Sequence, residues 1–456
     1  MIINFTIFTF RLLIFCFFCL FDETNHKLVA KIVVFPIFFL ILRRKSSNMV
    51  QLPEDFVRET RLVMGEERYN RFVEALNEEA PTSIRLNPQK VQASQCPEHA
   101  EGRVPWCHEG YYLKGRPPFT FDPLLHAGCY YVQEASSMFI THVLRTLLGN
   151  HSYQLSTINY PLSVLDMCAA PGGKSTAMRS VLPEGSTLVS NEPIANRAQI
   201  LLENITKWGW DNCIVTNHYP RDFKKAKAQF DMILCDVPCS GEGMFRKDPN
   251  AIGEWSLQNV ERCWRLQREI VGDAWECLVP GGLLIYSTCT FNTKENEENV
   301  RWIMETYDAE VLEVPTEPSW GITGSLLEDF KAPVYRFIPG YSKGEGLFMA
   351  VLRKAGDSHD IPNHKKGQQI SPLSAIDYQP EQFPKVALSY QEALKYLRGE
   401  ALVLPEDTPK GMVTMTYKGI TLGPAKNIGN RANNLYPKAW RIKTTHLPSE
   451  PVEILV

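Results

Sequence analysis

The sequence predicts an α/β protein built on a doubly wound, mostly parallel sheet, with an α+β module before it and a small β-rich domain after it. Apolar runs at residues 163–168, 230–236 and 282–288 indicate strands of this sheet, and stretches with helical periodicity separate them. Strands that are apolar throughout are typical of a parallel sheet covered on both faces. At 456 residues, the chain is long enough for two or three domains.

Residues 1–48 differ from the rest, and we expect them to be an over-extended start, with translation beginning at Met49. Arg11 interrupts a first apolar run and Pro36 a second. A central arginine costs roughly 2.5–3.5 kcal/mol in a membrane helix, and the second run is short for a span. Two shallow membrane segments are the alternative.

Residues 49–129 form the expected N-terminal module, and the periodicity of residues 54–79 predicts a helix in it. Residues 105–125 are rich in aromatic residues and turns, and Lys114 and Arg116 lie among them. Such aromatic rings either stack on unpaired bases or pack in the core. The aromatic residues in question are Trp106, Tyr111, Tyr112, Phe119 and Phe121.

A glycine-rich turn follows the first strand of residues 130–355, the expected catalytic domain. It reads Ala169-Ala-Pro-Gly-Gly-Lys-Ser175, and a helical pattern follows it. Glycines let a backbone approach a ligand closely, and the helix N-terminus offers free amides. The next strand ends at Glu192, about 20 residues later, where a carboxylate can accept hydrogen bonds from ribose hydroxyls. The spacing differs from dinucleotide and phosphate-loop motifs and favours S-adenosylmethionine over the alternative, an ordinary tight turn with a solvated glutamate.

Two later strands end in turns that each carry a cysteine, Cys239 and Cys289, and Asp236 precedes the first of them. Ligands bind outside the carboxyl ends of strands in such sheets. Two thiols and a carboxylate delivered there indicate covalent chemistry. Spacing alone does not choose the nucleophile. A buried structural thiol is the alternative for Cys289, but polar residues follow it directly.

Together these segments resemble the Nop/Sun family of RNA 5-methylcytosine methyltransferases. The similarity runs from about residue 52 to the C-terminus and looks closest to the bacterial small-subunit ribosomal RNA branch, which has an extra C-terminal domain. The matching motifs are Gly128-Cys-Tyr-Tyr-Val-Gln-Glu-Ala-Ser-Ser-Met138, Asp166-Met-Cys-Ala-Ala-Pro-Gly-Gly-Lys-Ser175, Asp236-Val-Pro-Cys-Ser-Gly-Glu-Gly243, Arg246-Lys-Asp248, Tyr286-Ser-Thr-Cys-Thr290 and Glu295-Asn-Glu-Glu298.

This resemblance implies a Rossmann-like, S-adenosylmethionine-dependent methyltransferase domain and assigns roles to its residues. Cys289 attacks the cytosine, Cys239 assists product release, Asp236 lies beside the base, and Lys174 supplies a positive charge. The N-terminal module supports the RNA cleft. The expected cofactor-binding residues are Cys168, Ala169, Ala170, Pro171, Gly172, Gly173, Lys174, Glu192, Tyr219 and Asp236.

Two positions depart from the family pattern. Tyr219 stands where relatives place an aspartate near the adenine, so either its ring stacks on the adenine or Asn217 contacts the amine. Gly340 follows Pro339 where relatives often have histidine, and no functional conclusion follows.

Residues 356–383 predict a linker, and residues 384–456 a small domain that the resemblance identifies as PUA-like. Its residues 410–443 carry seven Lys/Arg and no Asp/Glu. Tyr417, Tyr436 and Trp440 lie between these charges, and basic groups with aromatic surfaces are what RNA contact requires. A solvated basic face is the alternative.

Composition limits the partners. Removing the +4 balance of residues 1–48 from the net charge of −3 leaves −7, so RNA binding needs a localised basic surface. Twelve cysteines without framework spacing indicate reduced thiols in the cytoplasm. The histidines are scattered, and Cys96 and Cys107 form no CxxC pair. We therefore expect a monomer that binds RNA, either ribosomal RNA or the small ribosomal subunit, and no metal, DNA or membrane.

Three rival functions stay open at this point. Transfer RNA is the alternative substrate. A non-catalytic ribosome-assembly factor is the alternative from another class, although the chain has all four candidate catalytic residues. An exocyclic-amine methyltransferase would have an aromatic residue where this chain has Cys239.

Overall fold

The computed structural model describes residues 50–92, 95–149, 161–356, 371–373, 383–444 and 446–455. The expected N-terminal extension, and most of the expected linker, lie outside these residues. Within them, no helix is long and apolar enough to cross a membrane.

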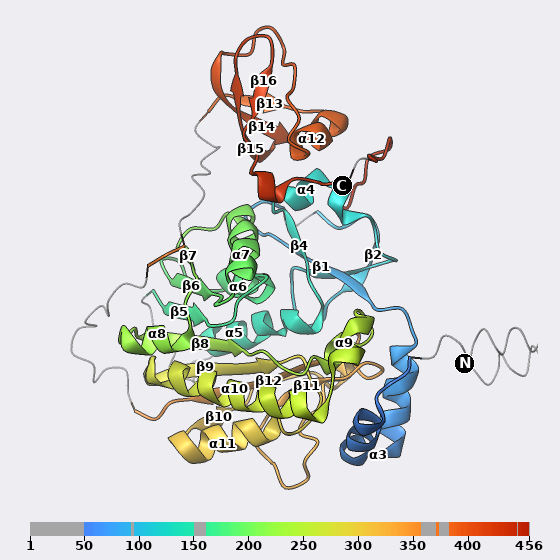
Figure 1. The fold of residues 1–456 in the computed structure, drawn as a ribbon, viewed down its shortest axis with the longest axis vertical. Helices are drawn as coiled ribbons and strands as arrows, with labels where there is room; N and C mark the ends of the chain where they lie inside the picture. The colour runs from blue at the N-terminus through green and yellow to red at the C-terminus, as the bar shows by residue number, and fades with distance from the viewer. Residues whose placement is uncertain are drawn as a thin grey trace, which may run out of the picture. The chain divides into compact units, whose positions relative to one another are not determined.

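The largest element of the fold is an eight-stranded sheet in the order β10-β12-β9-β8-β5-β6-β7, with β11 paired to β12 (Figure 1). The five strands β5 to β9 run parallel to their neighbours, whereas β12 is antiparallel to β9. This arrangement confirms the predicted doubly wound fold. The strands are β5 (Ser163–Asp166), β6 (Thr187–Asn191), β7 (Cys213–Thr216), β8 (Phe230–Asp236), β9 (Leu278–Thr288), β10 (Glu310–Leu312), β11 (Tyr335–Phe337) and β12 (Leu347–Arg353).

Helices cover both faces of this sheet. Val164 and Leu165, neighbours on β5, belong to different hydrophobic cores because successive strand residues point to opposite faces. One core includes residues of α5 and α6, and the other residues of α8, α10 and α11. The helices are α5 (Phe139–Gly149), α6 (Gly173–Arg179), α7 (Ala195–Trp208), α8 (Pro220–Lys225), α9 (Pro249–Glu254), α10 (Leu257–Glu276) and α11 (Glu297–Tyr307), with 3-10 turns η2 (Ser136–Met138), η5 (Glu242–Met244) and η6 (Pro318–Trp320).

The N-terminal module combines one long helix with a four-stranded sheet in the order β2-β3-β1-β4. The helix, α3 (Glu54–Leu76), is interrupted at Gly65, whose φ of 74° is not helical, and ends before the expected residue 79. The other elements are β1 (Thr82–Leu86), β2 (Ala100–Arg103), β3 (Gly110–Leu113), η1 (Phe119–Phe121), α4 (Pro123–His126) and β4 (Tyr130–Val132).

The C-terminal domain is β-rich, with a four-stranded sheet in the order β13-β14-β15-β16. Its core is continuous with that of the N-terminal sheet: Ile84 and Leu113 belong to the same buried cluster as Val413 and Met415. Its elements are β13 (Lys385–Ala387), α12 (Tyr390–Leu397), β14 (Gly411–Tyr417), β15 (Ile420–Asn427), β16 (Ala432–Asn434) and η9 (Lys438–Trp440).

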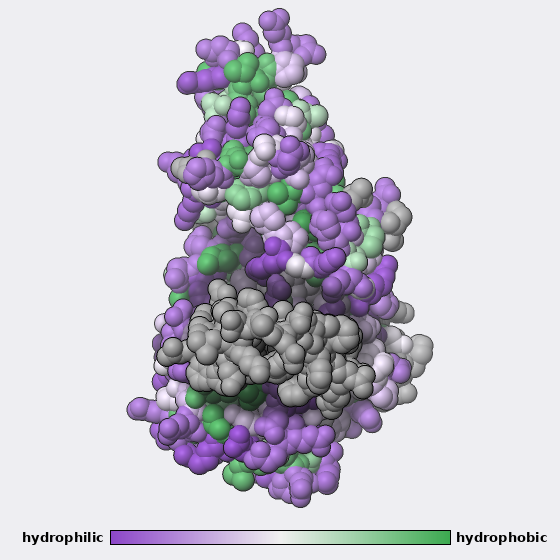
Figure 2. Space-filling model, turned by 90° about the vertical axis from the view of Figure 1, so that its right-hand side faces the viewer, coloured by the Kyte–Doolittle hydropathy of each residue, from purple (hydrophilic) through white to green (hydrophobic). Residues whose placement is uncertain are grey.

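Burial of the aromatic side chains corrects one hypothesis. Tyr417, Tyr436 and Trp440 are only 6%, 1% and 5% exposed, so they pack in the core and cannot stack on RNA bases. The hydrophobic gain from burying large rings outweighs their use as surface platforms. Trp106 and Tyr112 of the N-terminal module are equally buried. On the face shown in Figure 2, hydrophilic residues predominate outside the grey atoms, and hydrophobic ones occur in small groups.

Candidate active site

The glycine-rich turn lies at the carboxyl end of β5 and opens α6. Gly172 precedes the helix with φ 111°, a conformation that favours glycine. The Ala169 amide donates to Asn191 O at 2.7 Å, which ties the turn to the end of β6. The first-turn amides of α6 have no partner within the helix and can bind a ligand. Residues 168–174 therefore form a loop at the edge where ligands bind in such sheets.

Glu192 follows β6 and is 1% exposed. Its Oε1 accepts a hydrogen bond from the Ile194 amide at 3.0 Å. Its Oε2 lies 3.4 Å from Arg197 Nη1 but accepts no hydrogen bond within the described residues. A buried carboxylate oxygen with spare acceptor capacity fits the ribose hydroxyls of a nucleoside.

Two groups expected at the adenine side lie between β7 and α8. Asn217 Nδ2 donates to Glu192 O at 2.7 Å, which leaves the Oδ1 of the same amide to accept from an adenine amine. Tyr219 precedes α8, is 56% exposed and has the Arg221 guanidinium 5.0 Å from its ring centre. Tyr219 is the more exposed of the two, and both side chains stay candidates for the adenine contact.

Lys174 and Asp236 form an ion pair across the carboxyl ends of β5 and β8. Lys174 Nζ donates to Asp236 Oδ2 at 2.8 Å, and the two side chains are 14% and 29% exposed. Burial alone would lower the pKa of Lys174, but the Asp236 carboxylate outweighs it and the pKa is raised. The lysine is therefore a fixed positive charge at this edge of the sheet.

The two cysteines are brought together by the parallel register of β8 and β9, which places Asp236 opposite Ser287. Cys239 Sγ and Cys289 Sγ are 3.1 Å apart, although 50 residues separate them in sequence. Both side chains are partly exposed. The hydrogen bond to Cys289 and burial raise the pKa of the Cys239 thiol well above its usual value. The Cys239 thiol is therefore protonated at neutral pH.

Glu242 joins the two cysteine turns, a role that sequence reasoning missed. Its Oε2 accepts the backbone amides of Phe291 and Asn292 at 2.6 and 2.9 Å. Next to it, the Gly243 amide donates to Cys289 O at 2.8 Å, and a Cβ at Gly243 would lie only 2.7 Å from that oxygen. The approach of the turns thus requires glycine at 243.

Glu295 holds the first turn from the other side. Its carboxylate accepts the Ser240 amide at 3.1 Å and Gln267 Nε2 at 2.6 Å. Burial and the neighbouring Glu242 raise the pKa of Glu295 to about 7. Both glutamates lie in segments that carry the family resemblance, but only their contacts reveal what they do.

Asp166, at the end of β5, gives the site a testable pH dependence. Burial raises its pKa to about 7, although Ser175 Oγ donates to Oδ2 at 2.6 Å. In the unfolded chain the carboxyl titrates near about 3.9. Between these values the folded protein holds a proton that the unfolded chain has released. The contribution of Asp166 to the free energy of unfolding is therefore fully present below about pH 4 and falls as pH rises through about pH 7.

We accordingly expect urea unfolding to show that the wild type loses more stability than the Asp166→Asn variant between about pH 5 and about pH 7. Both proteins contain the other acids that titrate in this range, so their contributions cancel in the difference between the two stabilities. Equal losses would contradict a raised pKa at Asp166.

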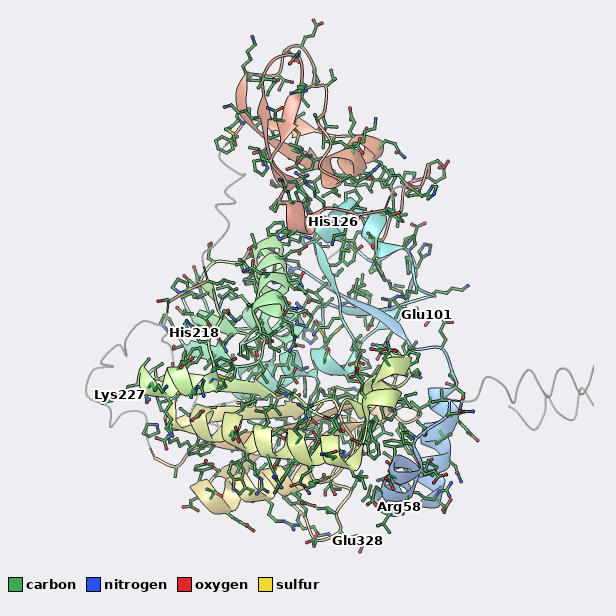
Figure 3. All side chains as sticks on the ribbon, in the orientation of Figure 1. Arg58, Glu101, His126, His218, Lys227 and Glu328 are labelled. Atoms are coloured by element: carbon green, nitrogen blue, oxygen red, sulfur yellow. The ribbon has the colours of Figure 1, made fainter. Side chains whose placement is uncertain are left out.

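His126 and His218 lie in different parts of the fold. His126 lies in α4 and His218 between β7 and α8 (Figure 3). Among the described residues, no group of three or more His, Cys, Asp or Glu side chains has the arrangement of a metal site.

The fold and the site together define a Rossmann-like methyltransferase that uses S-adenosylmethionine. Family models cover most of the chain: residues 156–353 match the 16S rRNA methyltransferase RsmB/F, residues 52–135 the N-terminal domain of 16S rRNA methyltransferase RsmF, and residues 383–442 the PUA domain of methyltransferase RsmF. The chain belongs to the RsmB/F family of 16S rRNA methyltransferases, which confirms the Nop/Sun resemblance.

Named relatives span most of the chain. Ribosomal RNA small subunit methyltransferase F of Cronobacter sakazakii is 33% identical over 381 residues, which cover 79% of this chain and 77% of the relative. The protein of the same name from Serratia proteamaculans is 32% identical over 364 residues, which cover 77% of this chain and 71% of the relative.

Solved structures share the fold. A methyltransferase homologue from Pyrococcus horikoshii is 25% identical, with a TM-score of 0.52, and covers 66% of this chain and 100% of that chain. NSun6 from the same organism, solved with SFG, is 20% identical with a TM-score of 0.54, and covers 68% and 100%. At that identity, the second likeness shows the fold alone.

Proposed function

We propose that this protein transfers a methyl group to carbon 5 of a cytosine in 16S ribosomal RNA, through a transient bond between Cys289 and carbon 6. The observation that carries the proposal is the 3.1 Å contact of Cys239 Sγ and Cys289 Sγ beside the Lys174–Asp236 pair. We further propose that it acts in the cytoplasm, as a monomer and without a metal ion.

Covalent addition addresses the low reactivity of cytosine at carbon 5. The Cys289 thiolate attacks carbon 6, and the electron pair of the carbon 5–carbon 6 double bond moves to make carbon 5 nucleophilic. When bound, S-adenosylmethionine supplies an electrophilic methyl group, and the electron pair of the broken carbon–sulfur bond stays on its sulfur. A base then removes the carbon 5 proton, the double bond re-forms, and the Cys289 thiolate leaves.

The two cysteines take different roles in this proposal, as the family resemblance implies. Cys239 keeps its proton, since the contact with Cys289 and burial raise its pKa. It is thus available as a hydrogen-bond donor to the Cys289 sulfur, and it lies within reach when that sulfur must be released. This supports Cys289 as the nucleophile and Cys239 as the residue that assists elimination.

Asp236 and Lys174 stabilise the charge that develops on the cytosine ring. Once ring nitrogen 3 of the cytosine is protonated as charge develops during the attack, the Asp236 carboxylate can accept a hydrogen bond from it, and Lys174 holds that carboxylate in place. The loop from Cys168 to Lys174 and the free Oε2 of Glu192 hold the cofactor, with the exposed ring of Tyr219 against its adenine.

The substrate follows from the relatives, which are named for the small-subunit ribosomal RNA. Six of the seven basic residues in 410–443 are exposed, so we propose that the C-terminal domain provides the localised basic surface. Its aromatic residues are buried, so we propose that it binds RNA phosphates rather than stacking on bases.

We expect a Lys426→Glu and Arg431→Glu double variant to bind 16S rRNA more weakly and with a shallower salt dependence, because each phosphate contact contributes to the salt slope. Filter binding at several salt concentrations measures this. Point variants are used because deletion of residues 384–456 would uncover the core shared with the N-terminal sheet. A Glu392→Gln variant of the same domain is the control. If the salt dependence of binding were unchanged in the double variant, the C-terminal domain would not bind RNA through these residues.

The reaction is tested with 16S rRNA that carries tritium at carbon 5 of its cytosines. We expect about one tritium released into water for each methyl group transferred, because substitution at carbon 5 expels that proton. Methyl transfer without tritium release would mean that a nitrogen or a ribose oxygen is the acceptor. Transfer RNA labelled in the same way is the comparison substrate. If tritium were released from transfer RNA and not from 16S rRNA, the substrate would be transfer RNA.

A further inference from the structure

Arg85 is a buried cation that the reaction does not use. It lies on β1 of the N-terminal module and is 1% exposed. Its guanidinium reaches the start of α6, where Nη2 donates to Thr176 Oγ1 at 2.6 Å and to Gly173 O at 3.3 Å. Nη1 donates to Thr176 O in α6 and to the Oγ of Ser180, which follows this helix, both at 3.5 Å.

The surroundings of Arg85 hold it by neutral groups. Nε donates to Gln133 Oε1 at 2.8 Å, and the Trp208 ring lies 4.5 Å from the guanidinium carbon. Within the described residues, no carboxylate forms an ion pair with it. Burial lowers the pKa of Arg85 to about 10, so it still carries its charge at neutral pH. Burying a charge is costly unless its geometry satisfies every donor, which points to a role that an apolar residue would not perform.

The neighbouring strand of the same sheet touches the same loop. Tyr131 lies opposite Arg85 in the register of β1 and β4, and its hydroxyl donates to Pro171 O at 3.2 Å. Gln133, the acceptor for Arg85, lies so near Gly173 that a Cβ there would be 3.5 Å from its side chain. Strand β1, through Arg85, and strand β4, through Tyr131, therefore both contact residues 171–176, where the glycine-rich turn enters α6.

We propose that Arg85 is a positioning residue for the cofactor loop. It fixes Gly173 and Thr176, the residues on either side of Lys174 and Ser175. Lys174 then holds Asp236, and Ser175 holds Asp166. A module expected to serve RNA thus also sets the geometry of the cofactor site. This inference rests on the use of S-adenosylmethionine and not on which RNA atom is methylated.

The test measures binding of S-adenosylhomocysteine to the full-length protein by calorimetry, without RNA. Arg85→Met keeps the length of the side chain and removes its donors, and we expect the dissociation constant to rise about tenfold or more, because small displacements of positioning groups are costly. Arg85→Lys restores the charge but not the set of donors, and we expect partial rescue. In turnover, KM for S-adenosylmethionine should rise in both variants, with kcat lowered less.

Lys90→Met is the matched control. Lys90 follows the same strand, and its Nζ donates to Ala127 O at 2.8 Å and to Lys207 O at 2.7 Å, at a place away from the start of α6. We expect it to lower the melting temperature without changing the dissociation constant. If Arg85→Met lowered the melting temperature and left binding unchanged, or if Lys90→Met weakened binding equally, Arg85 would have only a structural role. Should Arg85→Met fail to fold, the same comparison is made with Arg85→Lys, whose unchanged binding would equally overturn the proposal.

Because the ligand is measured without RNA, failure of this inference is distinguishable from failure of the proposed carbon 5 chemistry. Tritium release depends on the cysteines, whereas S-adenosylhomocysteine binding does not.

Discussion

Cys289→Ala is expected to lower the rate of methyl transfer by at least about 10³-fold, because removal of a covalent nucleophile leaves only binding and polarisation of the substrate. The variant should still bind S-adenosylhomocysteine, since the cofactor loop and Glu192 belong to other strands. Single-turnover transfer of a radiolabelled methyl group to 16S rRNA measures the loss. A tenfold change corresponds to about 1.4 kcal/mol, so the expected loss is at least about 4 kcal/mol of transition-state stabilisation.

A matched control removes a different thiol. Cys277 is buried between the end of α10 and the start of β9, whereas Cys289 follows the other end of β9, and Cys277→Ala should retain most of the activity. Near-normal transfer by Cys289→Ala would show that the covalent bond is formed elsewhere or not at all. Loss in both variants would indicate that the fold, and not the nucleophile, had been damaged.

Cys239→Ala is expected to have the opposite effect on the RNA complex, which should accumulate as a covalent adduct. Without the thiol 3.1 Å from Cys289, the attack on carbon 6 is still available but release of the sulfur is slowed. The protein is mixed with 16S rRNA and S-adenosylmethionine and run on a denaturing gel. The adduct appears as a band that migrates slowly and resists detergent, and the wild type should show it only faintly.

The double variant Cys239→Ala with Cys289→Ala separates the two roles, because it should form no adduct. An adduct in Cys289→Ala alone would exchange the assignments of the two cysteines. Absence of the band in Cys239→Ala, with methyl transfer intact, would mean that Cys239 is not needed for release.

The sheet was predictable because its strands are apolar on both faces. Runs such as 163–168 and 230–236 have that pattern only when helices cover the sheet from both sides. The turn residues were predictable for a related reason: polar residues and cysteines directly after such strands lie at one edge. Cys239 and Cys289 were therefore expected near each other before any distance was known.

Other residues gave no local signal. Arg85 lies in a short strand whose five residues are all buried, and its partners on α6 are about ninety residues away. Glu242 is a charged residue in a turn, where exposure would be the ordinary expectation, yet it binds two amides beside Cys289. The basic C-terminal stretch gave a misleading signal, because its aromatic residues alternate with charges along the chain but point into the core.

Local patterns thus determined the succession of strands and helices along the chain and the glycine turn. They also placed two sulfurs and a carboxylate at one edge of a sheet. These features depend on periodicity and on residues adjacent in the chain. Tertiary structure alone decided that the contact with Cys289 and burial raise the pKa of the Cys239 thiol, which polar groups hold the turns in place, and that the first and last domains share a core. Those properties arise from burial and from contacts between residues far apart in sequence, and no window of neighbouring residues contains them.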